Sequence, residues 1–174
     1  MNENQLRQLI KLESLKHLNK IAQVPNKTYD CFDCEQLINV VYRDLFQISI
    51  RKDGYGKSST TKVLTSSIGN FYNFSKLNIE EKKKKIFQIQ IGDILFFHTQ
   101  SLDEQSPTKE NWYPGHLGLY LGNQTFIHAK SSAGKVVISN LNEENYIDIL
   151  VGYKNLIPYI LDKLETEYLD TYKR

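Results

Sequence analysis

The chain has 174 residues, of which 40% are apolar and 24% are charged, and its formal net charge is +2. This length and composition fit one globular domain whose core needs no metal or disulfide support. The small charge gives no reason to expect nucleic-acid binding, and no apolar stretch approaches the length of a membrane span. We therefore expect a single domain over residues 1–174 that binds neither nucleic acid nor membrane.

The first predicted element is an amphipathic helix over residues 4–22. Leucine and isoleucine recur there at helical spacing among glutamine, lysine and asparagine. The segment lacks the basic start and uninterrupted apolar stretch of a secretory signal. We therefore expect synthesis as a cytoplasmic protein, unless an export signal has been removed.

A polar turn that holds both cysteines leads into the second predicted helix. Apolar spacing predicts that this helix runs from Cys34 to about Phe46, with Asp33 as its N-cap. Unpaired backbone N–H groups and the helix dipole favour an anion in the first turn, so we expect a lowered thiol pKa for Cys34. Cys34 is the candidate nucleophile. Cys31 is a neighbour that either forms a reversible disulfide with it or has no role.

The remaining chain predicts helices followed by an antiparallel sheet, which is an α+β fold of about five strands. Glycine turns separate three closely spaced strands, as in a meander. The predicted elements are a long polar loop over 47–78 with a short helix near 60–67, a helix over 79–87, a strand over 94–97, a surface loop over 99–114, strands over 116–121, 125–129, 135–139 and 147–153, and a closing helix over 156–172.

Two histidines lie on neighbouring strands of this meander. If the hairpin turns at Gly122-Asn123, paired residue numbers sum to about 245, and His116 lies opposite residue 129, beside His128. A cysteine nucleophile needs an imidazole that takes its proton, and this imidazole needs a polar group that fixes its tautomer. Cys34, His116 and His128 fit the roles of nucleophile, base and orienting group.

Four segments resemble the NlpC-type cysteine peptidases, papain-like enzymes that cut cell-wall peptides. The family motif Asp-Cys-Ser-Gly-Leu-Val corresponds to Asp-Cys-Glu-Gln-Leu-Ile at residues 33–38, and Gly-Asp-Leu-Val-Phe-Phe to Gly-Asp-Ile-Leu-Phe-Phe at 92–97. The family strand His-Val-Gly-Ile-Tyr-Leu-Gly resembles residues 116–122, and Phe-Ile-His-Ala recurs at 126–129. The resemblance covers residues 33–139.

The resemblance implies a papain-like fold with a catalytic core of about residues 29–154, flanked by the helices over 4–22 and 156–172. It implies a cysteine amidase or endopeptidase that cuts bacterial peptidoglycan stem peptide next to γ-D-glutamate through an acyl-enzyme. The family's Tyr-x-Trp-Gly-Gly segment is missing, and Tyr29 is a candidate replacement for its tyrosine. Trp112 and Tyr113 precede His116 and are candidates for a wall of the substrate groove.

The resemblance also sets expectations for partners and place of action. We expect a monomer without cofactor that acts on the bacterial cell wall, in the periplasm or outside the cell. A small wall-cutting enzyme without an export signal resembles amidase effectors delivered by secretion machines, or phage lysins. An effector of this kind would be paired with an inhibitor or immunity protein.

Three other interpretations fit part of the pattern. Cys31, Cys34, His116 and His128 include the donor types of a zinc site, although their spacing is not that of a structural finger. The Cys-x-x-Cys spacing also occurs in thioredoxin-like redox pairs, but no parallel βαβ pattern surrounds it. The third interpretation is a non-catalytic relative of the same fold that binds cell-wall peptide or a partner.

Overall fold

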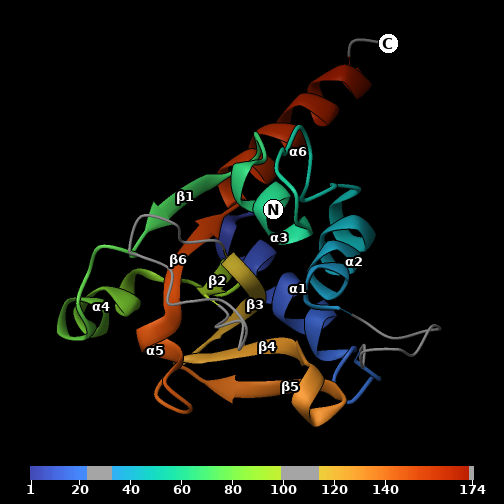
Figure 1. The fold of residues 1–174 in the computed structure, drawn as a ribbon. Coiled ribbons are helices and arrows are strands. Elements are labelled where there is room, and N and C mark those ends of the chain that lie inside the picture. The colour runs from blue at the N-terminus through green and yellow to red at the C-terminus, as the bar shows by residue number, and fades with distance from the viewer. Residues whose placement is uncertain (23–32, 99–113, 173–174) are drawn as a thin grey trace.

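The computed structural model describes residues 1–22, 33–98 and 114–172. Its strands form one antiparallel sheet in the order β1-β6-β2-β3-β4-β5 (Figure 1). The helices are α1 (Glu3–Leu15), α2 (Cys34–Phe46), α3 (Ser59–Thr65), α4 (Ile79–Lys85), α5 (Tyr146–Ile149) and α6 (Ile157–Tyr172), with the short turns η1 (Ile86–Gln88) and η2 (Ser131–Ala133). The strands are β1 (Asn70–Asn73), β2 (Ile94–His98), β3 (Pro114–Gly122), β4 (Thr125–Lys130), β5 (Lys135–Asn140) and β6 (Leu150–Asn155). The predicted α+β class is confirmed.

Helix α1 is shorter than the predicted helix over 4–22. It begins with a capping box of Asn2 and Gln5 and ends at Leu15. The chain then turns, with a positive φ of 66° at Asn19, and Ile21 forms a bridge with the edge strand β5. Residues near 21 keep the helical apolar spacing although they pair with the sheet. The spacing alone therefore predicted a helix that is too long.

Helix α2 has the predicted bounds. The carboxylate of Asp33 accepts a hydrogen bond from the Gln36 N–H at 2.7 Å, and the Gln36 side chain accepts one from the Asp33 N–H at 3.1 Å. This reciprocal capping box fixes the first turn, where Cys34 lies. The helix ends at Phe46, and its C-cap Gln47 adopts the left-handed conformation with φ of 54°.

The sheet has one strand more than the predicted five. β1 was expected to be part of a loop, but it pairs with β6 along its whole length. The predicted strand over 147–153 is in fact the short helix α5 followed by β6, which begins at Leu150. Tyr146 and Ile147 are consecutive and both buried, which a half-exposed strand would not allow.

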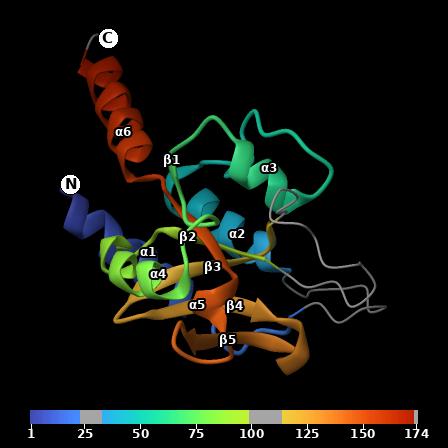
Figure 2. The same cartoon turned by 60° about the vertical axis from the view of Figure 1, so that its left-hand side comes forward.

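Alternate residues of the central strands enter two separate apolar clusters. Ile94 and Phe96 of β2 face a cluster that includes α1, α2 and the start of α6. Leu95 and Phe97 face a second cluster that includes η1 and α5 on the other side of the sheet. The sheet is thus covered on both faces, and the two layers of helices are separated by it (Figure 2).

Two side chains hold α1 and α2 against the turn before β2 through three hydrogen bonds. The hydroxyl of Tyr42 on α2 donates to the carbonyl of Gly92. The guanidinium of Arg7 on α1 donates to the carboxylate of Asp93 at 3.1 Å and to the carbonyl of Ile91 at 2.7 Å. The buried turn over residues 91–93 therefore sets the position of α2, and with it the first turn of this helix.

The closing helix α6 extends away from the body of the molecule (Figures 1 and 2). Ile157 and Ile160 at its start are buried, whereas Tyr168 and Leu169 are 61% and 48% exposed. Within the described residues, no helix combines the length and the apolar character needed to cross a membrane.

Candidate active site

Cys34 lies at the N-terminus of α2, partly buried against the apolar cluster beneath that helix. The backbone N–H groups of Leu117 on β3, of Glu35 and of Cys34 itself lie near enough to the sulfur to lower its pKa. Leu117 directly follows His116. The first turn of α2 therefore lies against the strand that carries the predicted base.

The lowered thiol pKa expected from the helix N-terminus is wrong for this structure. Burial raises the pKa of Cys34 to about 11, and the carboxylate of Asp33 beside it also raises the pKa. The three backbone N–H groups favour the thiolate but do not offset the lost solvation. The resting side chain is therefore a thiol, and a thiolate at this position needs a nearby acceptor for its proton.

The two predicted histidines lie in direct contact. Nε2 of His116 lies 2.7 Å from Nδ1 of His128, which is a hydrogen bond. The hairpin register differs from the expected one by a residue, because the turn residues are Asn123 and Gln124, both with positive φ, and a bulge follows. Leu119 pairs with Ile127, so paired numbers sum to 246 and the two histidines share one face as diagonal neighbours.

Strands β3 and β4 stop pairing before they reach the histidines. Among their described residues, the ladder ends at Leu119 and Ile127. His116 and His128 lie beyond this point, as does the Leu117 N–H that faces the sulfur of Cys34. Because the ladder ends here, the N–H of Leu117 and the imidazoles of His116 and His128 take no part in β3–β4 pairing. They are available to one another and to α2.

Aromatic rings surround the imidazole pair on its face of the sheet. The ring of His128 lies 4.7 Å from that of Phe126 and 5.8 Å from that of Tyr146, and His116 lies 6.1 Å from Phe97. A side chain at Gly118 would meet the Phe126 ring at 2.6 Å, so glycine is required at this position. The rings therefore shield His128, which is buried, from water, whereas His116 keeps some exposure.

This burial determines the charge of both imidazoles. It lowers the pKa of His116 to about 4. His128 is 1% exposed, and burial, together with the nearby His116 and Lys130, lowers its pKa to about 3. At neutral pH both rings are uncharged, so each carries one N–H and one bare nitrogen. Each ring therefore has one nitrogen that can accept a hydrogen bond or a proton.

Ser139 is a contact of this site that the sequence did not reveal. Its Oγ lies 2.9 Å from Nε2 of His128, and the side chain is buried on β5. The β4–β5 register pairs Phe126 with Ser139 and His128 with Val137, so serine and imidazole are diagonal neighbours on one face. Counting across the turn over residues 131–134 would have given this pairing, but a lone serine on an edge strand carries no signal of its own.

Glu35 replaces the serine that follows the cysteine in the family motif. It is 4% exposed, and its Oε1 lies 3.3 Å from Nε of Arg51, an ion pair without good hydrogen-bond geometry. Burial raises the pKa of this carboxyl, and Arg51 lowers it in part. A buried carboxylate one residue from the sulfur thus gives this site a different charge pattern from the family's serine.

Several predicted site residues lie outside the described residues. These are Tyr29, Cys31, Trp112 and Tyr113, so their predicted roles remain predictions. Cys34 is a free thiol. In the part of the chain that the structure describes, no three His, Cys, Asp or Glu side chains gather as metal ligands would.

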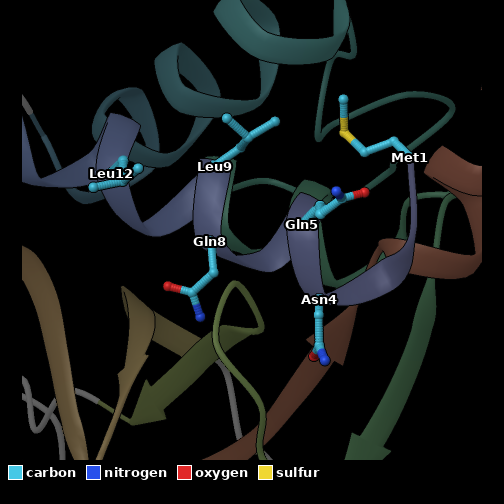
Figure 3. Close-up of a pocket in the computed structure, with 6 residues that line it drawn as sticks. All are labelled: Met1, Asn4, Gln5, Gln8, Leu9 and Leu12. Carbon is cyan, nitrogen blue, oxygen red and sulfur yellow. The ribbon is translucent and has the colours of Figure 1, made fainter.

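A hollow on the outer side of α1 is separate from the cysteine and histidines. Its volume is about 680 Å³. The side chains that line it are apolar or carry amides and include no nucleophile or titratable group: Met1, Asn4, Gln5, Gln8, Leu9 and Leu12 (Figure 3).

The site combines a helix-start thiol on α2, a hydrogen-bonded imidazole pair from β3 and β4, and a hydroxyl on β5 at the end of that pair. A thiol, an imidazole that can accept its proton and a polar group that orients this imidazole are the groups that cysteine-dependent hydrolysis requires. Residues 25–155 match the NlpC/P60 family, and the chain belongs to that family.

Curated relatives share part of their length with this chain. The murein DD-endopeptidase MepS/murein LD-carboxypeptidase of Escherichia coli K12 is 23% identical over 111 residues, which are 64% of this chain and 42% of that protein. The murein DD-endopeptidase MepH of the same strain is 23% identical over 148 residues, which are 80% of this chain and 45% of that protein. The chain thus matches less than half the length of these relatives.

Solved structures share the fold. An NlpC/P60 family protein from Bacillus cereus superposes with a TM-score of 0.56 at 19% identity, covering 87% of this chain and 40% of that chain. The NlpC/p60 domain of the peptidoglycan hydrolase SagA gives a TM-score of 0.53 at 17% identity, covering 86% of this chain and 97% of that domain. At these identities the likeness concerns the fold alone.

Proposed function

We propose that this protein is a cysteine hydrolase that cuts an amide bond in the peptide part of bacterial peptidoglycan. The observation that carries the proposal is the hydrogen-bonded pair of His116 and His128, adjoining the strand residue whose N–H faces the sulfur of Cys34. Membership of the NlpC/P60 family and the murein endopeptidases among the relatives support the substrate class.

In the proposed mechanism, the thiol proton moves from Sγ of Cys34 to Nδ1 of His116. Nε2 of that ring is bonded to His128, so Nδ1 is the nitrogen left for the sulfur. The thiolate attacks the amide carbonyl, and the tetrahedral intermediate collapses when His116 gives its proton to the leaving amine. Water then attacks the thioester with His116 again as base, which restores the thiol and releases the acid.

The raised thiol pKa and the lowered imidazole pKa mean that Cys34 and His116 are both uncharged in the resting protein. Burial makes both the free thiolate and the free imidazolium costly, so charge separates only as substrate arrives. The N–H groups near the sulfur are then aimed at the developing negative charge. His128 keeps the His116 ring in place during the transfer.

The finer parts of the proposal follow from the family resemblance. The scissile bond is the one next to γ-D-glutamate, the protein acts on the cell wall in the periplasm or outside the cell, and residues 1–174 act as one domain. Delivery by a secretion or lysis system, with an inhibitor or immunity protein as partner, is the corresponding biological role. Tyr29, Trp112 and Tyr113 would contact the substrate.

The test is digestion of purified muropeptides, with the products weighed by mass spectrometry. The wild type should release fragments one water heavier in sum than the substrate, cleaved next to γ-D-glutamate. Cys34→Ala should abolish turnover, and Cys31→Ala is the matched control that should retain most of it. A reversed pattern would move the nucleophile by one helical turn. Tight binding of muropeptides without cleavage would instead indicate the non-catalytic relative.

A further inference from the structure

The imidazole pair continues into a third group on the edge strand. Nε2 of His128 lies 2.9 Å from Oγ of Ser139, while its Nδ1 lies 2.7 Å from Nε2 of His116. Both ring nitrogens of His128 are thus engaged, and the three groups form one chain of hydrogen bonds from β3 through β4 to β5. His128 and Ser139 are 1% and 8% exposed, so water competes little for these contacts.

A chain of neutral hydrogen-bonding groups can be directed in only two ways. In the first, Nε2–H of His116 donates to His128, and Nε2–H of His128 donates to the oxygen of Ser139. Nδ1 of His116 is then bare and able to accept a proton. In the second, the Ser139 hydroxyl donates to His128, which donates to His116, and the remaining N–H of His116 is on Nδ1.

Only the first direction leaves His116 able to act as a base toward the thiol. The direction also suits the charged state, because an imidazolium at His116 must donate from Nε2 and needs a bare Nδ1 on His128. The oxygen at the far end makes the first direction available, since a buried N–H on His128 without an acceptor is costly. The tautomer of the base is therefore linked to a side chain two strands away.

We propose that Ser139 is a positioning residue, whose oxygen accepts from Nε2–H of His128 and thereby keeps Nδ1 of His116 unprotonated. This inference rests on the proposed function in that it explains how the proposed base is kept ready. Ser139 touches neither substrate nor the reacting atoms. No proton crosses between the histidines when the thiol proton reaches His116.

The experiment compares a hydroxyl with a methyl group of the same shape. Ser139→Thr keeps an oxygen beside His128, Ser139→Val replaces it by a methyl group, and Ser139→Ala removes it without adding volume. Ile138→Ala is the matched control, because Ile138 is the adjacent residue of β5 and is 42% exposed. Threonine and valine both suit a strand, so the pair remains informative even if the alanine variant folds poorly.

The primary readout is the tautomer of each ring, measured from ¹⁵N shifts of the imidazole nitrogens at neutral pH. Wild type, Ser139→Thr and Ile138→Ala should show protonated Nε2 on both histidines. Ser139→Val and Ser139→Ala should show an increased fraction with Nδ1 protonated on His116. A merely structural role for the serine would change melting temperature without this change of tautomer.

The second readout is the rate at which iodoacetamide alkylates Cys34, which needs no substrate. This rate and kcat/KM on muropeptides should fall about tenfold in the valine and alanine variants and return within about twofold in the threonine variant. Unchanged ¹⁵N shifts with unchanged alkylation in Ser139→Val would overturn the inference. The tautomers could depend on Ser139 in a protein whose wild type cleaves no muropeptide. This result would overturn the proposed function but would leave the role of Ser139 standing.

Discussion

The ammonium group of Lys154 lies 2.9 Å from the carbonyl oxygen of Ser66, inside the protein. Its Nζ also donates to the carbonyls of Val63 and Leu64 and to Oγ of Ser66, at 2.8–3.1 Å. Lys154 is 1% exposed and comes from β6, whereas its acceptors form the last turn of α3 and the residue after it. A buried cation thus donates hydrogen bonds to the C-terminal carbonyls of a short helix and interacts favourably with the negative end of the helix dipole.

This contact predicts a large loss of stability in Lys154→Met. The substitution keeps much of the side-chain volume but removes the ammonium that donates to the carbonyls at the end of α3, so we expect the free energy of unfolding to fall by about 3 kcal/mol. Chemical denaturation at pH 7 measures it. The matched control is Lys57→Met, because Lys57 is an exposed lysine next to α3 and should change stability by less than about 0.5 kcal/mol. Equal effects of the two substitutions would show that the buried ammonium contributes nothing.

Helix α3 also contacts the strand that carries His116. Thr60 on this helix donates its hydroxyl hydrogen to the carbonyl of Pro114, which begins β3 two residues before His116. Thr60→Val should therefore lower kcat/KM on muropeptides about threefold to tenfold at unchanged protein concentration and with a folded circular dichroism spectrum. Kinetics equal to those of the wild type would separate α3 from the positioning of His116.

The burial of His128 predicts a dependence of stability on pH. Its pKa is about 3 in the folded state and about 6.5 in an unfolded chain, so between these values only the unfolded chain binds the proton. Folded stability from this group is therefore present above pH 6.5 and is lost as the pH falls. Between pH 6.5 and pH 5 the loss should be roughly 1.5 kcal/mol.

His128→Gln should remove this part of the pH dependence. The measurement is the free energy of unfolding of wild type and variant at pH 5, 6.5 and 8, with their difference taken at each pH. Asp93, whose pKa burial raises to about 6, titrates in both proteins and cancels in the difference. The difference should shrink by roughly 1.5 kcal/mol toward pH 5. A difference that is constant with pH would mean that His128 is not held neutral.

The parts of the fold that the sequence predicted best are those whose local signals agree. The α2 helix has an N-cap, a capping box and a regular apolar face, and its observed bounds are those expected. The boundary of α1 was wrong because Ile21 continues a helical spacing but is used by the sheet edge. β1 was missed because its four residues have no apolar alternation and are defined by pairing with β6.

Some features of the candidate site could likewise be predicted from the sequence, and others could not. The contact between His116 and His128 could be predicted because both lie on a hairpin, where register follows from the turn. Ser139 could not be found from its own strand, since its importance comes from the neighbouring His128. The thiol pKa of Cys34 was predicted in the wrong direction because sequence position indicates the helix dipole but not the depth of burial.

The role predicted for Trp112 remains a prediction, because this residue lies outside the described residues. If it forms a wall of the substrate groove, Trp112→Ala should raise KM or lower kcat/KM about tenfold, equivalent to roughly 1.4 kcal/mol of lost transition-state binding. The melting temperature should stay the same. A lower melting temperature with normal kinetics would assign the indole to packing instead.

The sharpest prediction concerns how the thiol of Cys34 becomes reactive. With a pKa of about 11, an isolated thiol here would be ionised in only about one molecule in 10⁴ at pH 7. If His116 accepts the proton, wild-type Cys34 should react with iodoacetamide at pH 7 at least tenfold faster than Cys34 in His116→Gln. Mass spectrometry of intact protein and peptides would assign the label to Cys34 rather than Cys31.

In His116→Gln the rate should increase tenfold per pH unit toward the thiol pKa. Equal rates in the two proteins at pH 7 would show that His116 does not activate the sulfur.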